Sequence, residues 1–348
     1  MPEKVNLGAK AIGRGCPLFI TAECGVTCNY DLKLSKELID VTAEAGADAI
    51  KFIFWFPEEI MSDREVDYTY QTVEGTKSEN MFQMLQKLRF DLETWKELKA
   101  YADQKGVILF STVNSPSGVD WAEELGLVAY KLSSWDFNYV SLWRRIARLG
   151  KPMIIDTGPV HLDELAAVLR LMAQEGNDQA VLVHCYHTEL PAEKNLRSIP
   201  FLRRTFGVPS GFSSPDTRDE PDMAAIGLGA SFLEKRLTMS RRLPGHHHIL
   251  SKEPGEFIQY VKTMRELYDS LGEYALKPSP GDLKARREFF RRLVAARDLP
   301  VGTVLSEDML AAMRPERGGI SPEYLEFFLG RTLKRDLKAL EPISWDDV

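Results

Sequence analysis

The chain has 348 residues, of which 44% are hydrophobic and 27% are charged, so it can bury a large core and form one large and one small domain. Its net charge of −7 argues against a nucleic-acid partner, and basic residues gathered in a cleft would therefore serve a small anion. No apolar run approaches the roughly 20 residues of a spanning helix and the first residues lack a signal-peptide core, so we expect a cytoplasmic protein with no membrane partner.

An apolar strand over residues 17–23 opens a recurrent pattern of amphipathic helix, glycine and short apolar strand. Each glycine stands where a helix needs a left-handed cap before the chain turns into a strand, and the seven are Gly46, Gly106, Gly126, Gly150, Gly176, Gly207 and Gly229. Eight strands alternating with helices predict a (β/α)8 TIM barrel rather than an open sheet. The polar stretch 61–78, in the one long interval, predicts a loop insertion over the barrel mouth.

Two predicted strands carry a lysine within an apolar run, Lys51 in AIKFIF and Lys131 in VAYKLSSWD. A buried ammonium is costly unless an anion meets it, and the serines after Lys131 add hydroxyl donors for the same anion. A single such lysine could instead extend its charged end to solvent. Two of them on separate strands favour an anionic substrate.

The active sites of TIM barrels lie at the C-terminal ends of the strands. In this chain those ends combine lysines, hydroxyls and a few carboxylates, namely Glu23, Lys51, Ser111, Thr112, Lys131, Ser133, Ser134, Asp136, Asp156, Thr157, His184, Ser213, Ser214 and residues 234–236. Ammonium and hydroxyl groups that converge at a barrel mouth suit a ligand with a phosphate and a carboxylate.

The barrel pattern ends after Leu271. We predict a barrel domain over residues 1–275, a linker over 276–288 that contains proline and glycine, and a small loop-rich domain over 289–348. A unit of this size would gain stability by docking onto another surface.

The segments FITAECGV, EAGADAIKF, ILFSTVNS, LGLVAYKLSSWDFN, GKPMIIDTG, VLVHC, FGVPSGFS and LGASFLEKR occur in this order along the chain. Through them the barrel resembles the sialic acid synthase (N-acetylneuraminate synthase) family. The segments LVAARDLPVGTVLSEDML and LGRTLKRDLKALEPISWDDV resemble that family's antifreeze-like SAF domain. The resemblance implies that phosphoenolpyruvate condenses with an aldose or amino sugar, such as N-acetylmannosamine, to give a 3-deoxy-2-ulosonic acid and phosphate.

The same resemblance implies roles for individual residues. It assigns phosphoenolpyruvate binding to Lys51, Thr112, Lys131, Ser134, Ser213 and Arg286. Glu23 matches an acidic residue beside the reacting carbons, and Asp136 stands in for a family glutamate. Arg314 matches an arginine that the small domain of one subunit lays over the site of the other, so a domain-swapped homodimer is implied.

The family polarises the aldehyde with a divalent metal, Mn²⁺ or Mg²⁺, held by two histidines. This chain has neither histidine: Asp216 is the remaining candidate ligand, and Arg236 replaces one of the pair. We therefore predict that the fixed cation of Arg236 takes the place of the metal. Asp156 also departs from the family, which has serine at that position.

Two further metal hypotheses come from the residues themselves. The run His246, His247, His248 predicts either a replacement metal site or a loop that faces solvent or substrate. A soft metal could be held by residues near strand ends, Cys24, Cys28, Cys185, His184 and His187. The four cysteines, which include Cys16, otherwise predict free thiols, since they lack the spacing of a zinc site and the density of a disulfide scaffold.

Two other classes of function remain open. In a Schiff-base aldolase on the same barrel, Lys131 or Lys51 would be an amine nucleophile desolvated by its strand. A relative without catalytic activity could instead bind a sugar or a phosphate, which the missing histidines would permit.

Overall fold

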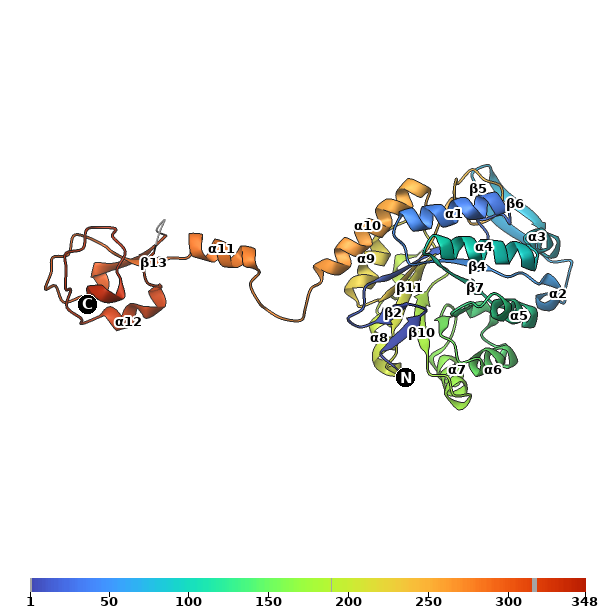
Figure 1. Ribbon diagram of the computed structural model, residues 1–348, viewed down its shortest axis with the longest axis horizontal. Coiled ribbons are helices and arrows are strands. Elements are labelled where there is room, and N and C mark those ends of the chain that lie inside the picture. The colour runs from blue at the N-terminus through green and yellow to red at the C-terminus, as the bar shows by residue number, and fades with distance from the viewer. Residues whose placement is uncertain (1, 189, 315–317) are drawn as a thin grey trace. The chain divides into compact units, whose positions relative to one another are not determined.

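A computed structural model describes residues 2–188, 190–314 and 318–348. The chain divides into two compact units, Met1–Gly272 and Glu273–Val348. In the first unit, parallel strands close into a barrel in the order β10-β11-β12-β3-β4-β7-β8-β9, which confirms the predicted TIM barrel (Figure 1). The strands are β3 (Phe19–Glu23), β4 (Ala49–Ile53), β7 (Ile108–Thr112), β8 (Tyr130–Leu132), β9 (Met153–Asp156), β10 (Ala180–Cys185), β11 (Ser210–Ser214) and β12 (Phe232–Arg236).

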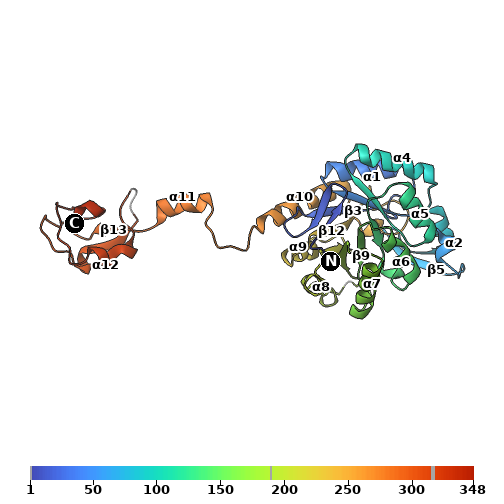
Figure 2. The same cartoon turned by 60° about the horizontal axis from the view of Figure 1, so that its bottom comes forward.

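Helices follow the strands and cover the outside of the barrel, as Figures 1 and 2 show. They are α1 (Leu32–Glu44), α4 (Leu92–Gln104), α5 (Pro116–Glu124), α6 (Val140–Arg148), α7 (Leu162–Gln174), α8 (Ser198–Phe206), α9 (Glu220–Gly227) and α10 (Pro254–Ser270). Helix α8 ends at Gly207, whose φ of 67° is the left-handed cap that a glycine adopts without strain. The other predicted cap glycines, Gly46, Gly106, Gly126, Gly150, Gly176 and Gly229, also have positive φ, so this prediction is confirmed.

Side chains alternate between the two faces of each barrel strand. In β8, Tyr130 and Leu132 belong to the hydrophobic core shared with the helices, and Lys131 between them meets carboxylates from other barrel strands. In β12, Leu233 belongs to the same core and Glu234 meets Lys131. This alternation gathers charged groups inside a barrel whose outer face is largely apolar.

The predicted insertion after β4 forms a short helix, a hairpin and a second helix. These are α2 (Pro57–Ile60), β5 (Asp67–Thr72), β6 (Gly75–Asn80) and α3 (Met81–Lys87). Tyr70, Met84 and Leu85 form its small core.

An N-terminal hairpin, β1 (Lys4–Leu7) and β2 (Lys10–Gly13), precedes the barrel and was not predicted. Its side chains Val5, Leu7 and Ile12 form one buried cluster with residues near the N-terminal ends of the strands, such as Phe19 and Ala49. The hairpin therefore packs against the end of the barrel opposite the strand C-termini.

The second unit has its own core, which includes Leu293, Leu299, Phe328, Leu337 and Ile343. Its elements are helix α11 (Pro280–Phe289), strands β13 (Arg292–Ala295) and β14 (Leu310–Met313), and helix α12 (Leu325–Phe328). Helix α11 occupies most of the segment 276–288 that we predicted as a linker, because Ser279 and Asp282 form a capping box at its start. No helix in the described parts of the chain is both long and apolar enough to cross a membrane.

Candidate active site

A cavity of about 560 Å³ lies at the C-terminal ends of the barrel strands. Most of the predicted site residues line it, namely Glu23, Lys51, Thr112, Ser134, Asp136, Ser213 and Arg236. Asp156 and Glu234 line it as well, while Lys131 lies beneath them. The strand ends thus bring residues from positions 23 to 236 of the sequence to one place, as expected for a TIM barrel.

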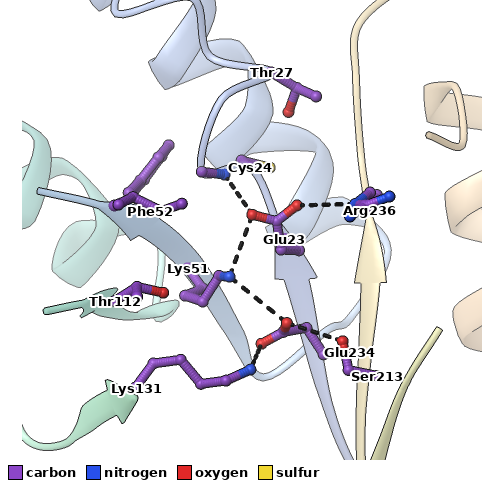
Figure 3. Close-up of polar contacts among 12 residues, drawn as sticks. Glu23, Cys24, Thr27, Lys51, Phe52, Thr112, Lys131, Ser213, Glu234 and Arg236 are labelled. Atoms are coloured by element: carbon purple, nitrogen blue, oxygen red, sulfur yellow. Dashed lines mark hydrogen bonds and ion pairs between the residues drawn. The ribbon is translucent and has the colours of Figure 1, made fainter. Parts of the chain in front are cut away.

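Two lysines and three carboxylates form the bottom of this cavity, and we call them the floor cluster: Glu23, Lys51, Lys131, Asp156 and Glu234. Figure 3 shows all of them except Asp156 with labels. The Nζ atom of Lys131 lies 2.7 Å from Glu234 Oε2 and 2.9 Å from Asp156 Oδ1. The Nζ atom of Lys51 lies 3.2 Å from Glu23 Oε1 and 3.6 Å from Glu234 Oε1. Since the Lys131 side chain is only 1% exposed, it does not extend to solvent, and that alternative is wrong.

The charges of this cluster are mutually stabilised. Burial alone would lower the pKa of Lys131, but the negative charges of Asp156 and Glu234 raise it above its ordinary value. Burial would likewise raise the pKa of Glu234, but Lys131 and Lys51 hold it below its ordinary value. Lys131 therefore remains an ammonium at neutral pH, a state in which an amine is not nucleophilic.

Glu23 lies between the floor cluster and Arg236 (Figure 3). Its Oε1 atom accepts a hydrogen bond of 2.8 Å from the backbone N–H of Gly25. Its Oε2 atom is buried without a hydrogen-bond partner among the described residues and lies 3.6 Å from Arg236 Nε. One carboxylate oxygen is thus fixed by the backbone, and the other has acceptor capacity left for a ligand.

Hydroxyl groups surround the charged floor. Ser213 donates a hydrogen bond of 3.1 Å to Glu234 Oε1, and Thr112 and Ser134 line the same cavity. Ser134 begins a 3₁₀ turn, Ser134–Asp136, that also places Asp136 at the cavity. Burial raises the pKa of Asp136 to about 6, so this carboxyl can carry a proton near neutral pH.

Arg236 is held at the cavity by the backbone. Its Nη1 atom donates a hydrogen bond of 2.8 Å to the carbonyl of Pro215, and its Nε atom faces Glu23. This leaves guanidinium donors of a permanent cation available at the cavity that Arg236 lines.

The residues around Arg236 do not fit a divalent metal. Asp216, the one candidate ligand from the sequence, accepts hydrogen bonds from Lys194 at 2.9 Å and Arg218 at 2.8 Å. Burial alone would raise the pKa of Asp216, but these two cations lower it to about 2. In the parts of the chain that the structure describes, no three His, Cys, Asp or Glu side chains are grouped to hold a metal ion.

The three consecutive histidines divide between the cavity and the core. His246 and His247 line the cavity, and burial followed by the charge of Arg236 lowers the pKa of His246 to about 4. His248 is buried, with Nδ1 2.7 Å from Thr238 Oγ1 and Nε2 3.0 Å from Asn29 Oδ1. His246 and His247 therefore face the cavity, and their imidazoles are neutral hydrogen-bonding groups.

The soft-metal hypothesis has no support from the geometry. His184 bonds the backbone carbonyl of Lys194 at 2.8 Å, and His187 packs against Trp135 with ring centroids 4.6 Å apart. All four cysteines are buried free thiols, as predicted.

Two features of the cavity were not assigned from the sequence. Glu234 was identified only as a strand-end residue, yet it contacts both lysines. The sequence pattern that could have identified it is a charged residue inside an apolar strand, the same pattern that identified Lys131. One side of the cavity is an apolar wall built by the insertion, which comprises Trp55, Ile60, Met61, Met81, Met84 and Leu85. The methionines in and beside the insertion were its only signal.

Arg286 and Arg314 belong to the second unit, so their proposed contacts with substrate stay a prediction. The guanidinium of Arg286 lies 4.5 Å from the ring centroid of Phe290, and Arg314 is exposed.

Comparison with known proteins assigns both units. A sequence model of the NeuB family matches residues 38–275, and one of the SAF domain matches residues 290–348. An N,N'-diacetyllegionaminic acid synthase from Campylobacter jejuni is 32% identical over 329 residues, which cover 93% of this chain and 98% of that protein.

Solved structures agree with the sequence matches. The spore coat polysaccharide biosynthesis protein SpsE from Bacillus subtilis is 29% identical with a TM-score of 0.67, covering 99% of both chains. The N-acetylneuraminic acid synthetase from Leptospira borgpetersenii, solved with citrate, is 25% identical with a TM-score of 0.73, covering 82% of this chain and 95% of that one. With its closed barrel, its charged floor and its C-terminal SAF domain, this chain belongs to the NeuB family, the family of the sialic acid synthases.

Proposed function

We propose that the protein condenses phosphoenolpyruvate with a sugar aldehyde to give a 3-deoxy-2-ulosonic acid and inorganic phosphate. The observation that carries the proposal is the pair of buried ammonium groups, Lys51 and Lys131, at the bottom of one cavity with hydroxyls and Glu23 around them. Charge-assisted contacts of this kind suit the phosphate and the carboxylate of phosphoenolpyruvate.

Each step can be assigned to residues of the cavity. The C2=C3 electron pair of phosphoenolpyruvate forms the new bond from C3 to the aldehyde carbon, and the aldehyde oxygen takes up a proton. Water then bonds to C2 and loses one proton, which leaves a C2 hydroxyl. The C2–O bond to phosphate then breaks, the hydroxyl proton passes to the departing phosphate, and the C2 ketone forms. Glu23, with one oxygen free of hydrogen bonds, stabilises the positive charge at C2 and orients the water.

Arg236 supplies the electrophile in this proposal. Among the described residues no group of three His, Cys, Asp or Glu side chains could hold a metal ion, and Asp216 is held by Lys194 and Arg218. A guanidinium fixed by the Pro215 carbonyl can donate a hydrogen bond to the aldehyde oxygen and stabilise the negative charge that grows there. Asp136, whose pKa burial raises to about 6, is the nearby acid that can deliver the proton.

The apolar wall supports an acceptor that carries acyl or other apolar substituents. Met61, Met81 and Met84 present flexible thioethers that adapt to such groups. One relative is an N,N'-diacetyllegionaminic acid synthase, whose named product has two acetyl groups, and this agrees with an acceptor that carries acyl substituents. The neutral imidazoles of His246 and His247 are suited to sugar hydroxyls.

The Schiff-base aldolase is the weaker alternative. Such an enzyme needs a neutral lysine, whereas the carboxylates beside Lys131 raise its pKa. Borohydride trapping in the presence of pyruvate would yield a covalent adduct only if this alternative held.

We also propose a domain-swapped homodimer in which Arg314 of one chain acts at the barrel of the other. An exposed arginine in a small separate unit is available for such a role. Mixing an Arg314→Ala chain with a Glu23→Gln chain should restore part of the activity, since each hybrid dimer contains one intact site. Absence of complementation in verified heterodimers would exclude the arrangement.

The deciding experiment is phosphate release from phosphoenolpyruvate in the presence of a panel of aldoses, including N-acetylmannosamine and diacetamido sugars. We expect release that depends on both substrates and is lost in the Glu23→Gln variant. A Glu37→Gln variant, altered at a half-exposed carboxylate on α1, is the matched control and should keep full activity. Failure of every aldose to elicit release, with phosphoenolpyruvate still bound, would favour the non-catalytic relative.

A further inference from the structure

The two carboxylates that contact Lys131 are held very differently. Glu234 accepts hydrogen bonds from Lys131 at 2.7 Å and from Ser213 at 3.1 Å, and its side chain is 4% exposed. Asp156 is paired with Lys131 alone: its Oδ1 atom lies 2.9 Å from Lys131 Nζ, it accepts no hydrogen bond from a second described side chain, and its side chain is 17% exposed. Asp156 is therefore the carboxylate that can leave Lys131 at the lower cost.

The balance of charges around the cavity floor is a reason for one carboxylate to lose its negative charge when an anion binds. Lys51, Lys131 and Arg236 are cations, and Glu23, Glu234 and Asp156 oppose them with an equal number of carboxylates. A site whose formal charges cancel has little attraction for phosphoenolpyruvate, which carries up to about three negative charges near neutral pH. An ionised Asp156 beside the bound ligand would add a direct repulsion between like charges.

We propose that Asp156 yields Lys131 to the incoming substrate anion and takes a proton from solvent as the anion binds. The inference rests on the proposed function, since it concerns how the same cavity accepts phosphoenolpyruvate. Protonation of one Asp156 oxygen leaves the floor cluster and Arg236 together with one net positive charge, and the carboxyl gains an O–H donor that can face the ligand.

The surroundings of Asp156 favour this change. Four groups act on it from other barrel strands: Lys131 from β8, Glu234 from β12, Lys51 from β4 and Cys185 from β10. Burial, the largest influence, and the charge of Glu234 raise its pKa, whereas Lys131 and Lys51 oppose this rise. Burial also raises the pKa of Cys185, which keeps the thiol neutral. When a ligand anion takes over Lys131, the opposing influence weakens and the pKa of Asp156 rises further.

Proton linkage gives the sign of the expected pH effect. Between the pKa of Asp156 in the free protein and its higher pKa in the complex, binding takes up a proton, so affinity falls as pH rises, by up to about tenfold per pH unit. The second phosphate pKa of the ligand is about 6, so above pH 7 the ligand itself adds little to this dependence.

The experiment is calorimetric titration with phosphoenolpyruvate alone, at pH 7.5, in buffers of different ionisation enthalpy. The wild type should take up close to one proton more per bound ligand than Asp156→Asn, while Asp136→Asn should match the wild type. Between pH 7 and 9 the wild-type Kd should rise with pH, whereas that of Asp156→Asn should stay within about twofold. Asp156→Ser replaces Asp156→Asn if the amide variant does not fold.

The outcomes separate this inference from the function on which it rests. Binding with the same proton count in the wild type and Asp156→Asn would overturn the role of Asp156 and leave the proposed function standing. If proton uptake disappeared in Asp136→Asn and not in Asp156→Asn, Asp136 would be the carboxyl that takes up the proton, and our proposal for Asp156 would be wrong. Absence of any phosphoenolpyruvate binding by the wild type would contradict the proposed function, and this inference with it.

Discussion

Strand β12 presents two buried charged clusters, one on each face, and they differ in how completely their polar atoms are paired. Glu234 points into the barrel and joins the floor cluster, whereas its neighbour Lys235 points outward and lies 2.8 Å from Asp222 Oδ2. Tyr260 donates a hydrogen bond of 2.9 Å to the other oxygen of Asp222. We call Asp222, Lys235 and Tyr260 the outer cluster.

The outer cluster is closed, and the floor cluster is open. Both Asp222 oxygens are paired, and the side chains of Lys235 and Asp222 are 1% and 0% exposed. In the floor cluster, Glu23 Oε2 has no hydrogen-bond partner within the described residues, Asp156 Oδ1 is paired with Lys131 alone, and both side chains line the cavity. A closed buried network stabilises a fold, whereas an open one keeps donors and acceptors for a ligand.

The largest effect should come from breaking the outer cluster. Lys235→Met leaves Asp222 buried without its cation, so the free energy of unfolding of the barrel should fall by about 3 to 5 kcal/mol. Guanidinium denaturation measures this, with Lys262→Met on the exposed face of α10 as the control. A loss below about 1 kcal/mol would mean that Asp222 does not depend on Lys235.

Breaking the floor cluster should instead affect catalysis. Lys131→Ala removes the ammonium that we assign to the substrate anion, so kcat/KM should fall by a factor that corresponds to about 2 to 4 kcal/mol. Steady-state phosphate release measures this, and Lys262→Ala should retain the wild-type value. If kcat/KM of Lys131→Ala stayed close to wild type, the floor cluster would be structural like the outer one.

Arg236 tests whether the open cluster works without a metal. Arg236→Gln should lower kcat by a factor that corresponds to a loss of about 1 to 3 kcal/mol of transition-state stabilisation. Arg236→Lys should retain part of the rate. Wild-type activity should survive exhaustive chelation. Activity that disappears with chelator and returns with manganese or magnesium would reverse this conclusion.

The smallest effects should come from removing one hydroxyl that donates a hydrogen bond to a carboxylate of each cluster. Tyr260→Phe removes the donor to Asp222 and should cost about 1 kcal/mol of stability while leaving KM unchanged. Ser213→Ala removes the donor to Glu234 and should raise KM for phosphoenolpyruvate several-fold while leaving the denaturation midpoint unchanged. The opposite assignment of the two effects would contradict the distinction between open and closed.

The barrel could be predicted because its signals are local. Cap glycines such as Gly207 and lysines such as Lys131 within apolar strands can be identified without knowing what lies across the barrel. Lys235 shows the limit of that reasoning, since FLEKR has the same kind of pattern as VAYKL but its lysine faces the helices. Only strand parity and the partner Asp222, 13 residues earlier on α9, distinguish the two.

Other features depend on contacts that the sequence does not encode locally. The apolar wall brings together Trp55 and Met84, which lie near opposite ends of the insertion. The sequence around either residue does not indicate that the two side chains meet. The hairpin β1–β2 has alternating apolar residues Val5 and Leu7 over only four positions, too short a run to separate from a loop.

That hairpin has a kinetic consequence. Val5, Leu7 and Ile12 pack against the strand starts, so in the described part of the chain they cover that end of the barrel, and we take the cavity at the strand C-termini as the route by which ligands enter and leave. The ligand that binds the floor must then arrive before the bulkier acceptor, which would otherwise block its path. Initial-rate and product-inhibition patterns should accordingly be those of a compulsory-order mechanism, with phosphoenolpyruvate first on and phosphate, released at the floor, last off.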